Sequence, residues 1–230
     1  MKLCVIIPTL NEEKNIYKLF KRINKTKVKL DILFIDDNSL DKTQSFIKEL
    51  KKKNKNIKYI FRKSRTGIGS AHKEGIKFCY KKKYDLIITM DGDGTHDPKY
   101  FKQMISNSKK FDYVITSRFK KPNLLKDWPL SRKILTYSRH FIVKFFLGIN
   151  FDASGAYRCF SVKKIRLQHI LSSKNNDYAF FWELTYNLHK KGYSIFETPV
   201  ELVFRKLGKS KMRLKHIINS LFYLFKIYTK

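Results

Sequence analysis

The stretch LIITMDGDGTHDP, residues 86–98, decides the fold because it joins an apolar run to three closely spaced aspartates. The aliphatic residues within 84–90 predict a buried strand. Asp91 and Asp93 follow where that strand ends. Asp97 and Pro98 then have the pattern of a helix N-cap and a first-turn proline. The stretch therefore predicts a strand, a polar loop and a helix in succession.

The rest of the first half repeats this unit. Apolar runs predict further strands at residues 3–8, 31–36, 57–61 and 112–117. Segments with apolar residues at helical spacing separate them, at residues 11–23, 39–53 and 68–82. This alternation predicts an α/β fold with a mostly parallel central sheet flanked by helices. Because polar groups follow each strand, we expect one composite site at the carboxyl edge of the sheet.

The second half has a different pattern. It predicts helices over residues 129–147 and 179–192, a turn with a short strand over residues 152–161, and an edge strand that Pro199 interrupts. No segment is rich enough in Pro, Gly or Ser to separate domains. We therefore expect one domain over residues 1–211, followed by a basic amphipathic helix over residues 212–230.

The composition is that of a folded protein with a strong positive charge. Hydrophobic residues make up 43% of the 230 residues, and the net charge is +31. This charge favours nucleic acid, an anionic membrane or phosphorylated ligands as partners, unless the lysines only decorate a solvated surface. Cys4, Cys79 and Cys159 are expected to be buried, reduced thiols of a cytoplasmic protein. We expect neither a signal peptide nor a membrane-spanning segment.

Asp91 and Asp93 are candidates for binding a metal ion. At positions i and i+2 of an extended chain, their side chains point to the same side. Two neighbouring carboxylates repel each other unless a cation or a proton joins them, and Mg²⁺ shares its ligands between carboxylates and substrate phosphates. Gly92 and Gly94, on either side of Asp93, have no side chain and so allow a diphosphate to approach the backbone. The alternative is a solvated turn with two capping aspartates.

Seven motifs occur in the order typical of one enzyme family. They are IIPTLNE (6–12), FIDDNSLDKT (34–43), GIGSA (67–71), MDGDGTHDP (90–98), TSRF (116–119), DASGAYRCF (152–160) and VFRKLGKSKM (203–212). With them the chain resembles the inverting family 2 glycosyltransferases, and among these the dolichol or polyprenol phosphate mannosyltransferases. The resemblance implies a GT-A-like fold, Mg²⁺ or Mn²⁺ as cofactor, and transfer of a hexose to a polyprenyl phosphate with inversion. The implied hexose donor is GDP-mannose.

The resemblance also implies roles for individual residues. The implied nucleotide-sugar pocket comprises Pro8, Leu10, Glu12, Asp36 or Asp37, and Asp91. The implied metal site comprises Asp91, Asp93 and Thr95. The residues implied to bind the acceptor phosphate are Arg118, Arg132, Arg205, Ser210 and Lys211. Among all of these, the expected catalytic residues are Asp91, Asp93, Arg118 and Arg205.

Four positions depart from the family pattern. Leu10 replaces a common Tyr, Gly92 a common Ala and Ser154 a Thr, while Thr95 stands where Gln or Ser helps to hold the ion. The metal preference therefore stays open. A lipid phosphate is already ionised at neutral pH, so the reaction needs no general base, and we expect structural roles for His96 and Glu183.

The C-terminal residues suggest a contact with a membrane. From Leu214 to Tyr228 apolar residues recur at helical spacing, and no acidic residue follows Glu201. Such a helix fits an anionic membrane surface, and it fits docking onto the core of its own domain equally well. We expect an enzyme at the cytoplasmic face of a membrane, held there by this helix or by an anchoring subunit.

Two other functions fit parts of the sequence. A related glycosyltransferase that uses UDP-glucose or another donor, or a saccharide acceptor, would carry the same motifs. A basic nucleic-acid-binding protein would explain the charge, and its binding would weaken steeply with salt. The acidic loops argue against nucleic acid, because carboxylates repel phosphates unless a metal bridges them.

Overall fold

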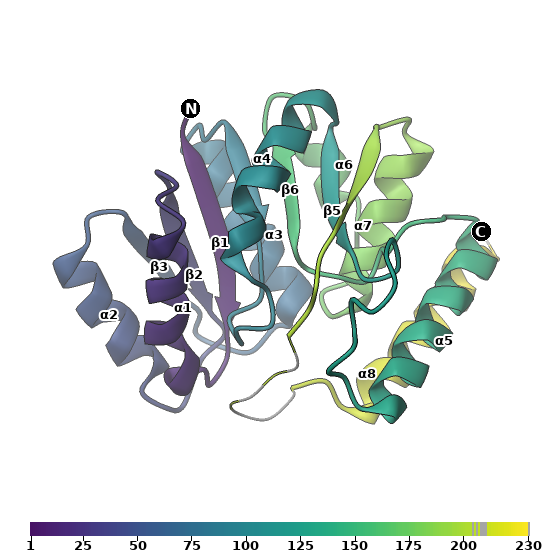
Figure 1. Ribbon diagram of the computed structural model, residues 1–230, viewed down its shortest axis with the longest axis horizontal. Coiled ribbons are helices and arrows are strands. Elements are labelled where there is room, and N and C mark those ends of the chain that lie inside the picture. Colours follow the sequence, from purple (N-terminus) through teal and green to yellow (C-terminus); the bar gives the residue numbers. More distant parts are fainter. Residues whose placement is uncertain (204, 206, 208–210, 230) are drawn as a thin grey trace.

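A computed structural model describes residues 1–203, 205, 207 and 211–229. At its centre is a seven-stranded sheet with the order β3-β2-β1-β4-β6-β5-β7 (Figure 1). The strands are β1 (Leu3–Thr9), β2 (Asp31–Asp36), β3 (Ile57–Phe61), β4 (Leu86–Thr89), β5 (Tyr113–Ser117), β6 (Arg158–Ser161) and β7 (Ile195–Pro199). Only β6 runs antiparallel to its neighbours, β4 and β5. The predicted mostly parallel sheet is confirmed, and β7 is an edge strand that ends at Pro199, as expected.

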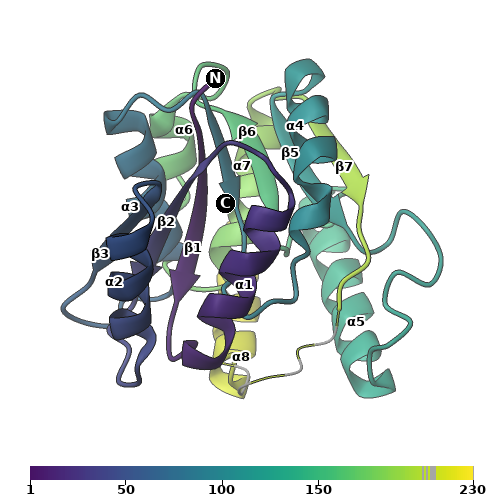
Figure 2. The ribbon, with the colours of Figure 1, turned by 60° about the vertical axis from the view of Figure 1, so that its left-hand side comes forward.

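Helices cover both faces of this sheet (Figures 1 and 2). They are α1 (Glu13–Lys25), α2 (Thr43–Lys53), α3 (Ile68–Lys81), the 3₁₀ turn η1 (Pro98–Tyr100), α4 (Phe101–Lys110), α5 (Leu130–Leu147), α6 (Leu167–Leu171), α7 (Ala179–Lys190) and α8 (Leu214–Tyr228). Buried side chains of α1, α2 and α4 pack against one face, and those of α3, α6 and α7 against the other.

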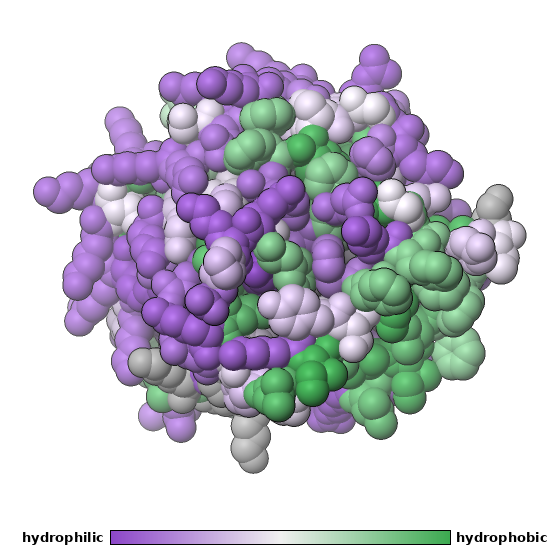
Figure 3. All heavy atoms as spheres, turned by 45° about the vertical axis from the view of Figure 1, so that its right-hand side comes forward, coloured by the Kyte–Doolittle hydropathy of each residue, from purple (hydrophilic) through white to green (hydrophobic). Residues whose placement is uncertain are grey.

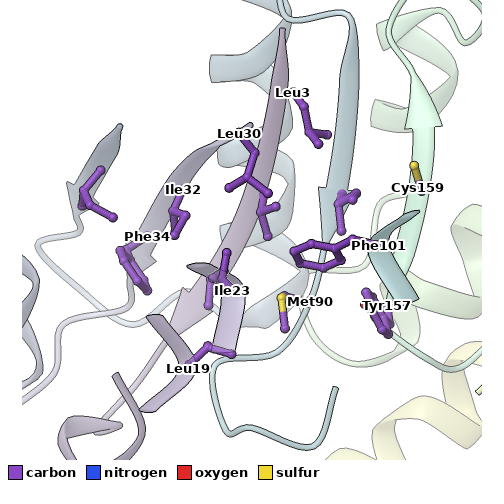
Figure 4. Packing of buried hydrophobic residues seen from close by; sticks show 14 of the residues in the cluster. Leu3, Leu19, Ile23, Leu30, Ile32, Phe34, Met90, Phe101, Tyr157 and Cys159 are labelled. Atoms are coloured by element: carbon purple, nitrogen blue, oxygen red, sulfur yellow. The ribbon is translucent and has the colours of Figure 1, made fainter. Parts of the chain in front are cut away.

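The strands form this two-sided core because successive side chains point to opposite faces of the sheet. In β1, Val5 and Ile7 point to the cluster shared with α1 and α4, whereas Cys4 and Ile6 point to the cluster shared with α3. Figure 4 shows the first of these clusters. β1 is buried along its whole length, which explains why its sequence is a continuous apolar run. The three cysteines are free and buried, as predicted.

A few element boundaries differ from the sequence prediction. Helix α2 begins at Thr43 instead of residue 39, because Asp41 accepts hydrogen bonds from the backbone N–H and the hydroxyl of Thr43 and holds the preceding turn. Asp97 accepts from the backbone N–H of Lys99, which confirms its predicted capping role. Helix α6 was not predicted, because five residues are too few to show helical periodicity.

Helices α5 and α8 lie side by side at one end of the molecule (Figure 1). Leu224 of α8 is buried in a cluster with Val143 and Leu147 of α5 and Trp182 of α7. The expected C-terminal helix is therefore present, and one side of it docks onto the rest of the chain. Among the described residues, no helix is both long enough and apolar enough to cross a bilayer.

Candidate active site

A cleft of about 980 Å³ opens at the carboxyl edge of the sheet. Loops after β1, β2, β3 and β4 contribute to its walls, as the parallel topology requires. The predicted site residues that line it are Pro8, Leu10, Glu12, Asp37, Asp91, Asp93, Arg205 and Lys211. A volume of this size accommodates a ligand as large as a nucleoside diphosphate sugar.

Asp91 has the most unusual environment in the cleft. Its Oδ1 atom is buried and has no hydrogen-bond partner among the described residues. Burial, followed by the negative charges of Asp93 and Glu12, raises the pKa of Asp91 to about 8. A buried carboxylate oxygen without a partner is energetically costly, and a bound cation would satisfy it.

His96 is hydrogen-bonded to the loop that carries Asp91. Its Nδ1 accepts a hydrogen bond from the backbone N–H of Asp91 (2.9 Å), and its ring stacks on Tyr157. Burial lowers the pKa of His96 to about 4, so the imidazole is neutral at pH 7. His96 therefore positions the loop instead of pairing ionically with the Asp91 carboxylate, as expected from the sequence.

Asp93 is held by its neighbours in a fixed orientation. Its Oδ1 accepts hydrogen bonds from the hydroxyl (2.7 Å) and the backbone N–H (3.0 Å) of Thr95. Gly94 has a φ of +81°, which lets the chain turn back so that Thr95 reaches this oxygen. The Thr95 hydroxyl is thus directed at Asp93, and Thr95 itself does not line the cleft.

Arg205 contacts acidic residues from two other segments that line the cleft. Its guanidinium donates to both carboxylate oxygens of Glu12 (2.9 and 2.8 Å) and lies 3.3 Å from Asp93 Oδ2. The Nζ of Lys211 lies 3.2 Å from Glu12 Oε1. The structure brings these four predicted residues together, while Ser210 lies outside the described residues.

Asp36 and Asp37 have different surroundings. Asp36 is fully buried and accepts hydrogen bonds from Thr9, Ser39 and Gln44, so its carboxylate is used to hold the fold. Asp37 lines the cleft, pairs with Arg62 (2.9 Å) and accepts from the backbone N–H of residues 66 and 67. Of the two alternatives left by the sequence, Asp37 is the one at the cleft.

Arg118 follows β5 and is buried outside the cleft lining. Its side chain makes a bidentate pair with Asp152, with Nε 2.8 Å from Oδ2, and it also donates to the Ser154 hydroxyl (2.7 Å). Burial opposes the charge of Arg118, but the charge and hydrogen bonds of Asp152 outweigh it and raise the pKa of Arg118, and the charge of Asp91 adds to this increase. Asp152 was part of a quoted motif, but nothing in the sequence indicated that it would fix this arginine.

Arg132, like Asp36, Thr95 and Arg118, does not line the cleft. It lies in the first turn of α5, exposed, and its side chain has no ionic or hydrogen-bonding partner in the described part of the chain. The cleft also has lining residues that sequence reasoning missed. They include Asp177, Tyr178, Arg213 and His216. Their segments carry no motif, and only the fold brings them to the cleft.

Residues 4–168 match the model of the family described as Glycosyl transferase family 2. The chain belongs to this family. This assignment makes the protein a glycosyltransferase, and it confirms the family resemblance of the sequence motifs. The nucleic-acid-binding alternative is therefore set aside.

Two curated relatives align with this family 2 glycosyltransferase over most of its length. One is the undecaprenyl-phosphate mannosyltransferase of Micrococcus luteus, 28% identical over 92% of this chain and 88% of the relative. The other is the polyprenol monophosphomannose synthase of Mycolicibacterium smegmatis, 28% identical over 95% of this chain and 83% of the relative.

A solved structure shares the fold of this glycosyltransferase. Glucosyl-3-phosphoglycerate synthase from Mycobacterium tuberculosis, crystallised with Mn²⁺, UDP and glucosyl-3-phosphoglycerate, superposes with a TM-score of 0.64 at 15% identity. The match covers 97% of this chain and 79% of that chain. The similarity confirms the expected GT-A-like fold.

Proposed function

We propose that this glycosyltransferase transfers mannose from GDP-mannose to a polyprenyl phosphate, with inversion at the anomeric carbon. The two relatives named above support the sugar and the acceptor, because both align over nearly the whole chain. The observation that carries the proposal is the cleft itself, in which the buried Asp91 Oδ1 has no partner among the described residues and the cations of Arg205 and Lys211 line the same walls.

Asp91 and Asp93 would hold a divalent cation, Mg²⁺ or Mn²⁺. The donor set fits such an ion: Asp91 Oδ1 is buried without a partner, and the neighbouring Asp93 and Glu12 add negative charge. When bound, the ion would supply positive charge to the leaving diphosphate. In the described residues no group of three or more Asp, Glu, His or Cys is poised to hold a metal, which suits an ion that completes its ligand shell with substrate phosphates.

The proposed step needs no general base from the protein. An ionised phosphate oxygen of the acceptor forms a bond to the anomeric carbon, while the bond from that carbon to the diphosphate oxygen breaks. The diphosphate leaves with the electron pair, and attack from the opposite face inverts the centre. His96 is neutral and donates nothing to the cleft, and Glu183 accepts hydrogen bonds from Tyr223 and two backbone N–H groups.

Arginines and a lysine would gather the phosphates. Arg205 and Lys211 line the cleft, where both are paired with Glu12. Preorganised cations beside a leaving diphosphate stabilise the charge that develops in the transition state. We therefore assign Arg205 and Lys211 to the donor diphosphate and Arg118 to the acceptor phosphate.

The exposed surface of α5 and α8 would contact the membrane that holds the lipid acceptor. Of the fifteen large hydrophobic side chains that are exposed among the described residues, twelve lie on these two helices. Figure 3 shows them as one hydrophobic region at one end of the molecule. Neither helix contains an acidic residue, so the surface suits anionic lipid. We propose that the enzyme binds peripherally at the cytoplasmic face of a membrane, with or without an anchoring subunit.

The test is a transfer assay with separate donors and acceptors. The purified protein is incubated with a polyprenyl phosphate, Mg²⁺ or Mn²⁺, and radiolabelled GDP-mannose, UDP-glucose or UDP-N-acetylglucosamine in parallel. We expect label in the lipid phase with GDP-mannose, and its loss with EDTA. Transfer of label from another donor would show that the transferred sugar is not mannose from GDP-mannose. Label on an added saccharide but not on the lipid would refute the polyprenyl phosphate acceptor. The variant Lys102→Gln, in an exposed residue of α4, is the control for the loss of a positive charge.

A further inference from the structure

The first turn of α8 lines the active-site cleft. Arg213, Lys215 and His216 contribute to the same walls as Asp91 and Arg205. Arg213 is the N-cap of α8, and its backbone N–H donates a hydrogen bond to Nδ1 of His216 (2.9 Å). Two cations and an imidazole from this turn therefore border the space in which the nucleotide sugar is proposed to bind.

Helix α7 holds this turn beside the cleft. The His216 ring packs edge-on against the ring of Tyr178, with ring centroids 5.4 Å apart, and Tyr178 also lines the cleft. One turn further along both helices, the hydroxyl of Ser220 accepts a hydrogen bond from the indole N–H of Trp182 (3.2 Å). Because these contacts recur at helical spacing, the start of α8 has a fixed position against α7.

The two cations of this turn are not neutralised by a carboxylate. Arg205 and Lys211, the other cations described above in the cleft, both pair with Glu12. Arg213 and Lys215, in contrast, form no ion pair with any of the described residues, and both are exposed. Cations that line a ligand cleft without a counter-ion are suited to bind an anionic group that enters it.

The hydrophobic surface of α5 and α8 starts at the same turn. Leu214, between the two cations in sequence, is 71% exposed, and the exposed side chains of Ile218 and Phe222 follow it at intervals of four residues. Figures 1 and 2 show α8 beginning on the side of the molecule where β1 ends. Among the described residues, α8 is the one element that both lines the cleft and contributes to this hydrophobic surface. A pair of cations around an exposed leucine matches a phosphate joined to a hydrocarbon chain.

We propose that Arg213 and Lys215 bind the phosphate of the lipid acceptor as it enters the cleft from the membrane, while Leu214 contacts the start of its hydrocarbon chain. The inference rests on the proposed function, since it assumes a lipid phosphate as acceptor. A phosphate bound at this turn shares the cleft with Asp91, so it lies on the same side of the molecule as the donor sugar.

This role differs from the one assigned to Arg118. Arg118 is buried, is paired with Asp152 and does not line the cleft. The exposed cations of α8 are accessible to a lipid that approaches along the hydrophobic surface, whereas Arg118 is not. We therefore assign capture of the acceptor to the first turn of α8.

Steady-state kinetics in micelles of a neutral detergent test this assignment. We expect Arg213→Gln and Lys215→Gln each to raise the KM for polyprenyl phosphate about three- to tenfold, the effect of one exposed charge-assisted hydrogen bond. The KM for GDP-mannose should stay within about twofold of wild type, and Lys102→Gln is again the control for the loss of a positive charge. Lys226→Gln removes an exposed charge from the other end of α8. If it raises the acceptor KM as much as Lys215→Gln does, position in the cleft is irrelevant and the proposal is overturned.

Calorimetric titration in EDTA separates this inference from the proposed function and identifies the source of the phosphate. Dodecyl phosphate, below its micelle concentration, should bind wild type more tightly than inorganic phosphate does. The double variant Arg213→Gln/Lys215→Gln should lose about tenfold or more in affinity for dodecyl phosphate, whether or not the wild type transfers mannose. Unchanged affinity in this variant would overturn the inference and leave the proposed function intact.

The apolar part of the site has its own test. Leu214→Ser should weaken the binding of dodecyl phosphate about tenfold and leave the binding of inorganic phosphate unchanged, because only the former has a chain to contact the side chain. Equal affinity of wild type for the two ligands, or no effect of Leu214→Ser on dodecyl phosphate, would show a site for free phosphate and overturn the assignment to the lipid acceptor.

Discussion

In EDTA, Asp91→Asn is expected to raise the thermal stability of the protein at pH 8. The pKa of Asp91 rises from 3.8 to about 8, because of burial first and of the charges of Asp93 and Glu12 second. The folded protein therefore keeps a proton that the unfolded chain releases near pH 4. The stability due to that proton is fully present below pH 4 and is lost as the pH rises through 8. Asn resembles the protonated carboxyl and removes this loss.

The size of the effect follows from the pKa and the exposure of the side chain. A difference between 3.8 and about 8 corresponds to at most about 6 kcal/mol. The Asp91 side chain is 31% exposed, and hydration there screens the charge, so we expect about 1–3 kcal/mol at pH 8. For a protein of this size, each kcal/mol raises the melting temperature by about 2–4 °C.

The assay is thermal unfolding followed by circular dichroism at pH 5 and pH 8, in EDTA and in Mn²⁺. Wild type should lose stability between pH 5 and pH 8 in EDTA and regain it in Mn²⁺ at pH 8. Asp91→Asn should show neither change, whereas Asp177→Asn, at an exposed position of the same cleft, should behave like wild type. If Asp91→Asn is less stable than wild type at pH 8 in EDTA, the carboxylate is not under electrostatic stress and the reasoning fails.

Three further variants test other parts of the structure. Asp152→Ala leaves Arg118 buried without its partner and should lower the free energy of unfolding by about 3–5 kcal/mol in urea titrations; a loss below about 1 kcal/mol would contradict the buried pair. Arg205→Gln should raise the KM for GDP-mannose about tenfold or more, and an unchanged donor KM would rule out its diphosphate role. The double variant Phe141→Ser/Phe222→Ser should reduce flotation with phosphatidylglycerol vesicles at least tenfold, because about 1.5–3 kcal/mol is lost for each side chain, and full flotation would show that these helices do not bind lipid.

Much of the fold could be predicted because the strands of a two-sided sheet are uniformly apolar. The predicted ranges 31–36 and 57–61 coincide with β2 and β3, and the five strands of the first half are all present. The position of Pro199 at the end of an edge strand followed from its missing N–H. What could not be predicted was strand direction and order, since the four residues of β6 (RCFS) carry no pattern that distinguishes an antiparallel strand from a parallel one. Pairing depends on contacts between distant segments, which local pattern does not specify.

The site could be predicted only where its residues stand close to strand ends. Asp91, Asp93 and Glu12 follow strands directly, so the parallel topology places them in one cleft. On helix α5 the sequence pattern gives no such constraint. Arg132 is exposed and Arg139 is partly buried on the same helix, and this difference depends on where α5 meets the segment after β5, a contact made by His140 and Phe119.

The direction of β6 has a consequence for how this enzyme can vary. The loop that follows a parallel strand lies at the functional edge of this sheet. Because β6 runs antiparallel, the loop that precedes it lies at that edge instead. Asp152 and Ser154 precede Arg158, the first residue of β6, and they meet Arg118 from this entry loop. Changes in the length of the segment between α5 and β6 would therefore displace Asp152, the carboxylate that pairs with Arg118. Insertions after Ser161, at the opposite edge, would leave the chemistry undisturbed.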